Sequence, residues 1–246
     1  MPTNKVTSFN FLENKTIANK YKLHEQLGKG WEGEVYKATE IATKLPCAIK
    51  FFYPQRNKNN KIANTYANKL YNLAASPVAI KYYTQETIQF KSQKITCFIF
   101  EYAEGEILST FLNRQIGKRI GVLQGLQLLH SLTTGIESLH RLDEYHGDLH
   151  QDNIIIKRRG LGFDFKLLDM YNWGDSKKLN RAEDICSLIR LFYDSIGGKK
   201  QYQKHPPEVK EICLGLKKSL IIKKFKTASH LINHIENIDW QSVYRI

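Results

Sequence analysis

The chain has 246 residues, with 37 Lys and Arg against 24 Asp and Glu, so its formal net charge is +13 at pH 7. A content of 42% hydrophobic and 11% aromatic residues excludes a disordered chain, and four cysteines are too few for a disulfide scaffold of this length. No apolar run reaches the roughly 18 residues of a membrane span, and the N-terminus lacks the apolar core of a signal peptide. We therefore expect a cytoplasmic protein without a membrane span, whose positive charge suits either a nucleotide or a polyanion.

The first half of the chain predicts a small sheet with one helix. Apolar and polar residues interleave around a glycine cluster from Tyr21 to Ala38, and an apolar run extends from Cys47 to Tyr53, which predicts strands. Residues 56–73 place apolar side chains at helical spacing and end before Ser76 and Pro77, which predicts a helix. Further strands are predicted at Ile80–Tyr83, Thr87–Phe90 and Ile95–Tyr102.

The second half is predicted to be mainly helical, with the boundary near Glu104. Residues 123–141 carry apolar residues at helical spacing, and helices resume from about Ala182. Between these segments, Ile154–Ile156 and Phe165–Leu168 predict a small hairpin that turns at residues 158–160.

A glycine-rich segment lies between the first two predicted strands. Glycines let a hairpin backbone approach phosphate groups closely, because side chains there would block the approach. A lone match also fits an ordinary glycine-rich turn, whereas a dinucleotide fold would need the glycines to open a helix. The following strand places Lys50 where one ammonium could reach phosphates beneath the loop. The residues of this pattern are Gly28, Gly30, Gly33, Val35, Ala48 and Lys50.

A second polar cluster surrounds the predicted hairpin. Asp148 and Asn153 lie five positions apart on one loop, a spacing that lets one side chain orient a hydroxyl group and the other hold a metal ion. Asp169 follows an apolar strand and could provide another metal ligand. A polar turn before a strand uses the same residue types. Zinc binding by His146 and His150 is disfavoured, because this pair needs a helix to converge.

In their order along residues 21–196, these motifs resemble the protein kinase superfamily. The resemblance implies an α+β, bilobal fold with a small antiparallel β-sheet lobe that carries one helix and a larger, mainly α-helical lobe. The implied division is an N-terminal extension at residues 1–20, a small lobe at 21–103 and a large lobe at 104–246. Asp184 resembles the buried aspartate that opens the long helix of the larger lobe.

The resemblance also implies ATP and Mg²⁺ as ligands and assigns residue roles. Asp148 would orient the acceptor hydroxyl, Lys50 would neutralise phosphates, and Asn153 and Asp169 would hold the metal. The nucleotide would contact the glycine-rich loop, the apolar walls of the cleft, the hinge backbone and a ribose-binding carboxylate. These residues are Leu27, Gly28, Gly30, Gly33, Val35, Ala48, Lys50, Phe100, Glu101, Ala103, Glu106 and Ile155.

Several departures bear on the acceptor. The usual Arg before the catalytic Asp is Gly147, the usual Lys two residues after it is His150, and no Ala-Pro-Glu follows. The segment between Asp169 and Asp184 is therefore a short activation segment. The loop also resembles that of aminoglycoside, choline and lipopolysaccharide-core sugar kinases, which makes a small-molecule acceptor an alternative. A protein acceptor is favoured, which would make the chain an atypical serine/threonine protein kinase, because the 44 positions from Tyr102 to His146 are too few for the large insert of the aminoglycoside and choline kinases. An ATP-binding pseudokinase is the third alternative.

Two features of the charge distribution leave alternatives open. Kinases usually pair the lysine with a helix glutamate, yet no acidic residue occurs between Ile41 and Gln85. We expect Asn64, Ala67 or Asn68 near that position, and Lys50 beside Asp169 or nucleotide phosphate. The segment 199–226 holds nine lysines and two glutamates, which fits a solvated helical surface or a site for nucleic acid or an acidic surface.

Overall fold

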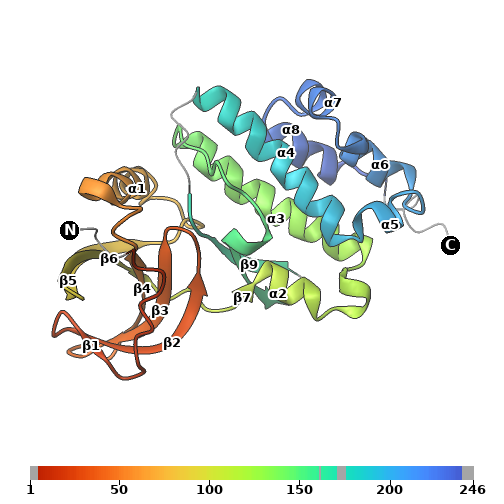
Figure 1. The fold of residues 1–246 in the computed structure, drawn as a ribbon. Coiled ribbons are helices and arrows are strands. Elements are labelled where there is room, and N and C mark those ends of the chain that lie inside the picture. The colour runs from red at the N-terminus through yellow and green to blue at the C-terminus, as the bar shows by residue number, and fades with distance from the viewer. Residues whose placement is uncertain (1–4, 161, 171–175, 240–246) are drawn as a thin grey trace. The chain divides into compact units, whose positions relative to one another are not determined.

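The computed structural model describes residues 5–160, 162–170 and 176–239, and it divides into two compact units (Figure 1). The first unit spans Met1–Ala74 and Ile80–Ala103, and the second spans Ala75–Ala79 and Glu104–Ile246. The first unit is a sheet with one α-helix, whereas the second is mainly helical. The predicted α+β class, with a small antiparallel sheet that carries one helix and a larger, mainly helical part, is confirmed.

The first unit is built on a six-stranded sheet of order β1-β2-β3-β4-β6-β5, in which each described pair is antiparallel. One strand, β5, replaces the two short strands that were predicted between Ile80 and Phe90. The elements of the unit are β1 (Thr16–Ile17), β2 (Tyr21–Lys29), β3 (Gly33–Glu40), β4 (Pro46–Phe52), α1 (Lys61–Asn72), β5 (Tyr82–Phe90) and β6 (Gln93–Glu101).

Helix α1 begins at Lys61, five residues later than the apolar spacing predicted. Asn59 and Asn60 adopt left-handed backbone conformations with φ of 51° and 58°, which interrupt a helix. Residues 58–60 therefore form a separate 3₁₀ turn before α1.

The two faces of this sheet have different partners. In antiparallel pairs, residues opposite one another project from the same face. Glu34 lies opposite Phe51, and this face belongs to an apolar core that also includes Val6, Phe9 and Phe11. The rings of Phe9 and Phe11 lie 5.7 and 4.8 Å from that of Phe51. The segment 6–11 of the predicted N-terminal extension is thus packed into the core of the first unit.

In the second unit, α3 packs against α4, α8 and β9 (Figure 1). The predicted hairpin is confirmed as β8 and β9, and β7 adds a third strand beside β8. The elements are β7 (Glu106–Ile107), α2 (Leu108–Asn113), α3 (Val122–Arg141), β8 (Ile154–Arg159), β9 (Gly162–Leu167), α4 (Lys177–Ser195), α5 (Gly198–Tyr202), α6 (Pro207–Cys213), α7 (Lys218–Lys224) and α8 (Ala228–Glu236).

Helix α4 begins at Lys177 instead of near Ala182. Its first turn is polar and largely exposed, so it carries no apolar period that would predict a helix. Ion pairs fix this turn to the loop after α3: Lys177 Nζ lies 3.2 Å from Glu144 Oε1, and Arg181 pairs with Asp143.

Within the described ranges, no helix combines the length and the apolar character that crossing a membrane requires. The thiols of Cys47, Cys97, Cys186 and Cys213 are free and buried. Burial raises the pKa of Cys97 to about 12.

Candidate active site

The glycine-rich segment forms the hairpin between β2 and β3. Gly28 lies opposite Val35, and the N–H of Gly30 donates a 2.9 Å hydrogen bond to the carbonyl of Gly33. A Cβ atom on Gly33 would lie 1.9 Å from the carbonyl oxygen of Phe51, whereas one on Gly28 or Gly30 would meet no atom within 4 Å. Gly33 is therefore required by hairpin packing, while Gly28 and Gly30 leave open space above their backbone.

The second face of the sheet gathers the predicted nucleotide-binding residues of the first unit. Val35 lies opposite Lys50, and Ala48 lies opposite Phe100, so these side chains share the face away from Glu34. Phe100 and Lys50 are buried, while Val35 and Ala48 remain partly exposed. Leu27 is 43% exposed. Partly exposed apolar side chains beside one ammonium are suited to a ligand with a flat apolar ring and an anionic end.

Lys50 pairs with Glu32, an acid of the glycine-rich loop. Its Nζ lies 2.9 Å from Glu32 Oε2, and the side chains are only 7% and 20% exposed. Its ammonium also lies 5.3 Å from the ring centre of Tyr66 and 5.6 Å from that of Phe52. Tyr66 is thus a residue of α1 that lies beside Lys50, whereas the prediction named Asn64, Ala67 or Asn68. Sequence reasoning missed Glu32 because it looked for an acid only between Ile41 and Gln85.

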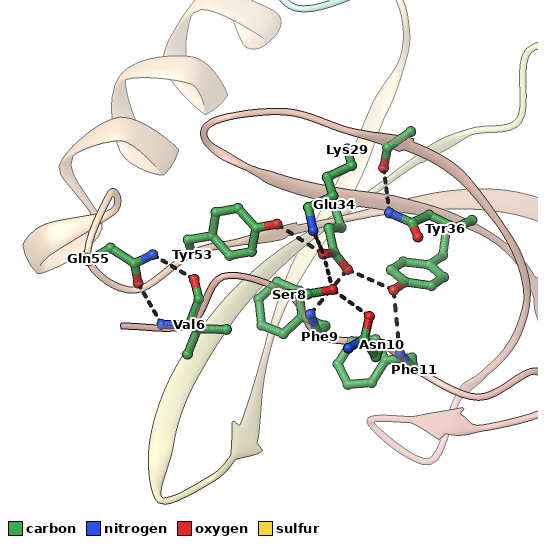
Figure 2. A network of polar contacts seen from close by, with 12 residues as sticks. Val6, Ser8, Phe9, Asn10, Phe11, Lys29, Glu34, Tyr36, Tyr53 and Gln55 are labelled. Atoms are coloured by element: carbon green, nitrogen blue, oxygen red, sulfur yellow. Dashed lines mark hydrogen bonds and ion pairs between the residues drawn. The ribbon is translucent and has the colours of Figure 1, made fainter. Parts of the chain in front are cut away.

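On the opposite face, Glu34 is buried in a network of hydrogen bonds (Figure 2). Its carboxylate accepts from Ser8 Oγ at 2.7 Å, Phe9 N at 3.2 Å, Tyr36 Oη at 2.7 Å and Tyr53 Oη at 2.9 Å. Burial raises the pKa of Glu34, but these hydrogen bonds outweigh burial and hold it below its usual range. Burial and the bond to Glu34 raise the pKa of Tyr36 to about 12. The network ties the N-terminal segment to the strand directly after the loop.

In the second unit, Asp148 and Asn153 lie together on the loop before β8. The amide nitrogen of Asn153 donates to the backbone carbonyl of Asp148 at 2.8 Å and lies 3.4 Å from its Oδ2. Asn153 is 7% exposed, whereas the Asp148 side chain is 49% exposed. The buried amide therefore fixes the loop, and the carboxylate remains accessible to a ligand.

Asp184 organises this loop from α4. Its two carboxylate oxygens accept from the backbone N–H groups of His146 at 2.8 Å and Gly147 at 2.9 Å. The same residue is 1% exposed and lies 3.1 Å from Nε2 of His140. The expected buried aspartate is thus present, although it lies in the second turn of α4 instead of opening the helix.

Asp169 lies beside the same loop. The N–H of Leu168 donates to the carbonyl of Asn153 at 2.8 Å, and Asp169 has a φ of 45°. Its side chain is exposed. Residues 171–175 of the predicted short activation segment lie outside the described residues.

The oxygen donors of Asn153 and Asp169 fit Mg²⁺, which proteins bind with one or two side chains together with substrate phosphates and water. Across the described part of the chain, no group of three or more His, Cys, Asp or Glu side chains is arranged to hold a metal ion. The metal would therefore take its remaining ligands from phosphate oxygens and water.

The other predicted binding residues are distributed between the units. Glu101 ends β6, and its backbone N–H donates to the carbonyl of Lys81 at 2.9 Å; Ala103 is the last residue of the first unit. Glu106 in β7 pairs with Arg114, and Ile155 is a partly exposed residue of β8. Each residue's contact with a nucleotide stays a prediction.

His150 is a further residue of the loop before β8. Its Nε2 lies 2.9 Å from the Asn153 amide nitrogen and 3.6 Å from Asp148 Oδ2. The imidazole thus lies against both Asp148 and Asn153. The short spacing of these residues in the sequence could have indicated this contact.

The lysine-rich segment 199–226 runs along α5, α6 and α7, and some of its lysines have acidic partners. Lys218 Nζ lies 2.6 Å from Glu183 Oε2, and Lys224 Nζ lies 2.6 Å from Glu211 Oε1. These exposed ion pairs are typical of a solvated surface. Nucleic-acid binding by the segment stays a prediction.

Comparison with known proteins agrees with this geometry. Residues 21–211 match the family described as "Protein kinase domain". The "Probable serine/threonine-protein kinase YbdM" of Bacillus subtilis is 26% identical over 239 residues, which cover 92% of this chain and 90% of that protein. The "CTD kinase subunit alpha" of Saccharomyces cerevisiae is 31% identical over 170 residues, which cover 68% of this chain and only 30% of that protein.

A solved structure shows the same fold. The "Crystal structure of Rad53 1-466 in complex with AMP-PNP" has a TM-score of 0.67 and 19% sequence identity, and it covers 87% of this chain and 60% of that chain. At this identity the likeness concerns the fold.

Proposed function

Because the chain belongs to the protein kinase domain family, we propose that it transfers the γ-phosphoryl group of ATP to a serine or threonine hydroxyl of a protein. The observation that carries this proposal is the loop in which Asn153 fixes Asp148 by a 2.8 Å hydrogen bond while Asp148 stays exposed. Such a loop presents one carboxylate to an acceptor at a defined position. Positioning of the reacting groups, together with electrostatic stabilisation, accounts for most of the catalysis of phosphoryl transfer.

The chain's own residues divide the work. Asp148 accepts the hydrogen bond of the acceptor hydroxyl and orients its oxygen for in-line attack. Lys50 contacts the α- and β-phosphates, and the open backbone at Gly28 and Gly30 covers them. Val35, Ala48, Phe100 and Ile155 contact the adenine ring, with Leu27 at its edge. These roles rest on the motif order and the contacts given above.

Asn153 and Asp169 would hold Mg²⁺ through their side-chain oxygens. When bound, the metal neutralises charge on the phosphate oxygens. The backbone of Glu101 and Ala103 would bind the adenine edge, and Glu106, which pairs with Arg114, would bind the ribose hydroxyls.

The test is transfer of labelled phosphate from ATP and Mg²⁺ to generic protein acceptors, and separately to aminoglycoside, choline and sugar acceptors. We expect label on protein and a loss of at least about a hundredfold in Asp148→Asn. Asp164→Asn is the matched control, because Asp164 is an exposed carboxylate of β9 that lies 3.6 Å from Arg159; it should keep wild-type activity.

Label on a small molecule alone would overturn the protein acceptor and leave the transferase. An Asp148→Asn variant as active as the wild type would overturn the catalytic assignment. If ATP stabilises the wild type and no acceptor receives label, the chain is a nucleotide-binding pseudokinase.

A further inference from the structure

Lys50 forms an ion pair with an acid of the glycine-rich loop. Lys50 lies in β4 and Glu32 in the loop before β3, and their side chains meet at 2.9 Å. Lys50 is 6% exposed as a whole residue. A buried ammonium is costly without a carboxylate close by, so this contact contributes to holding the Lys50 side chain in place.

Local backbone structure explains why Glu32 reaches Lys50. If side chains alternated strictly along the strand, Glu32 would lie on the same face of the sheet as Glu34 and the N-terminal segment, away from Lys50. The chain bends at Trp31 and Glu32 before β3 begins, which breaks that alternation. The N–H of Tyr53 donates to the carbonyl of Glu32 at 2.8 Å, so the backbone of the acid is tied to the end of the strand that carries Lys50.

Helix α1 offers aromatic packing instead of charge at this place. The sequence of Lys61–Asn72 contains no acidic residue. Its Tyr66 ring, which stacks on Phe98 at 6.1 Å, faces the ammonium of Lys50 at 5.3 Å. A ring face attracts an ammonium more weakly than a carboxylate does, so Tyr66 cannot substitute for an acid in fixing its direction.

We propose that Glu32 is the positioning residue of Lys50 in phosphoryl transfer, a role that rests on the function proposed above. The carboxylate of the loop holds the ammonium toward the phosphates, in the place where other kinases use an acid from the helix. Because both partners are fixed to β3 and β4, the position of Lys50 is set by this hairpin and does not depend on a carboxylate from α1.

The test compares Glu32→Gln, Glu32→Asp and Glu25→Gln with the wild type. Glutamine keeps the size and the hydrogen-bonding oxygen of Glu32 but removes its charge. Glu25 is the matched control, because it is an acid of the neighbouring strand β2 that pairs with Lys37 at 3.4 Å and is 59% exposed. For each variant, kcat, KM for ATP and the thermal unfolding midpoint are measured.

We expect Glu32→Gln to lower kcat per folded molecule roughly ten- to hundredfold, as a displaced catalytic group does. Glu32→Asp should recover part of the loss, because it restores the charge one methylene shorter. Glu25→Gln should match the wild type in kcat and KM. A purely structural role would change the midpoint and leave kcat per folded molecule unchanged.

The proposal is overturned if Glu32→Gln keeps the wild-type kcat. It is also overturned if this variant binds ATP more tightly and turns over faster, because Glu32 would then compete with phosphate for Lys50. Lys50→Met separates the proposed function from the role of Glu32. If Lys50→Met loses activity and Glu32→Gln does not, the proposed function stands and only the role of Glu32 is refuted. A wild type without transfer activity refutes both.

Discussion

At the scale of single residues, the three positions of the loop require glycine for different physical reasons. Gly33 lies against backbone, because a Cβ atom there would be 1.9 Å from the Phe51 carbonyl oxygen and backbone cannot move aside cheaply. Gly28 and Gly30 face open space. The same motif therefore combines one glycine that the fold requires with two that leave room for a ligand.

We predict that Gly33→Ala destabilises the protein by about 2 kcal/mol or more, in the range measured for overpacked sites, as seen in urea unfolding. Gly30→Ala should leave the unfolding midpoint unchanged and weaken ATP binding, measured by titration calorimetry. If the two variants are equally stable and bind ATP equally well, the assignment of different roles to Gly33 and Gly30 is wrong.

Some site residues were predictable from sequence because their spacing is set locally. Gly28, Gly30 and Gly33 lie in one hairpin, and Asp148 and Asn153 on one loop, so short-range patterns identify them. Glu32 was not predictable as the partner of Lys50, because the pairing depends on the bend at Trp31 and on the register of β3 with β4. The sequence shows the acid but not the direction of its side chain.

At the scale of elements, the N-terminal segment and strand β3 act together through Glu34. The carboxylate accepts hydrogen bonds from Ser8 and Phe9 on the segment and from Tyr36 and Tyr53 on the sheet (Figure 2). Charged acceptors make stronger hydrogen bonds than neutral ones, so the segment depends on the ionised form of Glu34.

We predict that Glu34→Gln lowers the free energy of unfolding by about 2 kcal/mol near pH 7. The glutamine amide nitrogen is itself a donor and cannot accept the hydrogen bonds that the carboxylate accepts. The folded-state pKa of Glu34 is depressed, so its contribution is fully present above the ordinary carboxyl pKa of about 4.3 and is lost as pH falls through the folded value. Urea unfolding from pH 7 to pH 3.5 should show the difference between variant and wild type shrinking below about pH 4.3.

Glu40→Gln is the control, because Glu40 lies on the same strand and its carboxylate accepts from Thr43 at the surface at 2.5 Å. Its effect should be small at every pH. A Glu34→Gln difference that stays constant down to pH 3.5 would contradict the ionised network.

The fold was predictable where one face of an element is buried, and less so elsewhere. Alternation identified β2 and β3, an apolar run identified β4, and helical spacing identified α3. The packing of Val6, Phe9 and Phe11 was missed, because a short irregular segment has no period to read. The start of α4 was missed because long-range ion pairs, such as Lys177 with Glu144, stabilise a polar turn.

At the scale of the whole molecule, the charge of +13 divides into parts with different roles. Between Ile41 and Gln85 there are seven basic and no acidic residues, and one of them, Lys50, takes its partner from outside this range. The lysines of segment 199–226 include members of exposed ion pairs with Glu183 and Glu211. Within the first set only Lys50 has a proposed role toward a nucleotide, and nucleic-acid binding by the second set stays a prediction.

The central claim is that a kinase fold without an acid in helix α1 still transfers the phosphoryl group to an acceptor hydroxyl that Asp148 orients. The most direct measurement is the rate of labelled phosphate transfer to a protein acceptor at saturating ATP and Mg²⁺, for the wild type and Asp148→Asn, with ATP occupancy measured in both. We predict steady transfer by the wild type and a rate lower by about a hundredfold or more in the variant at equal occupancy. Bound ATP without transfer in the wild type, or equal rates in both proteins, would contradict the claim.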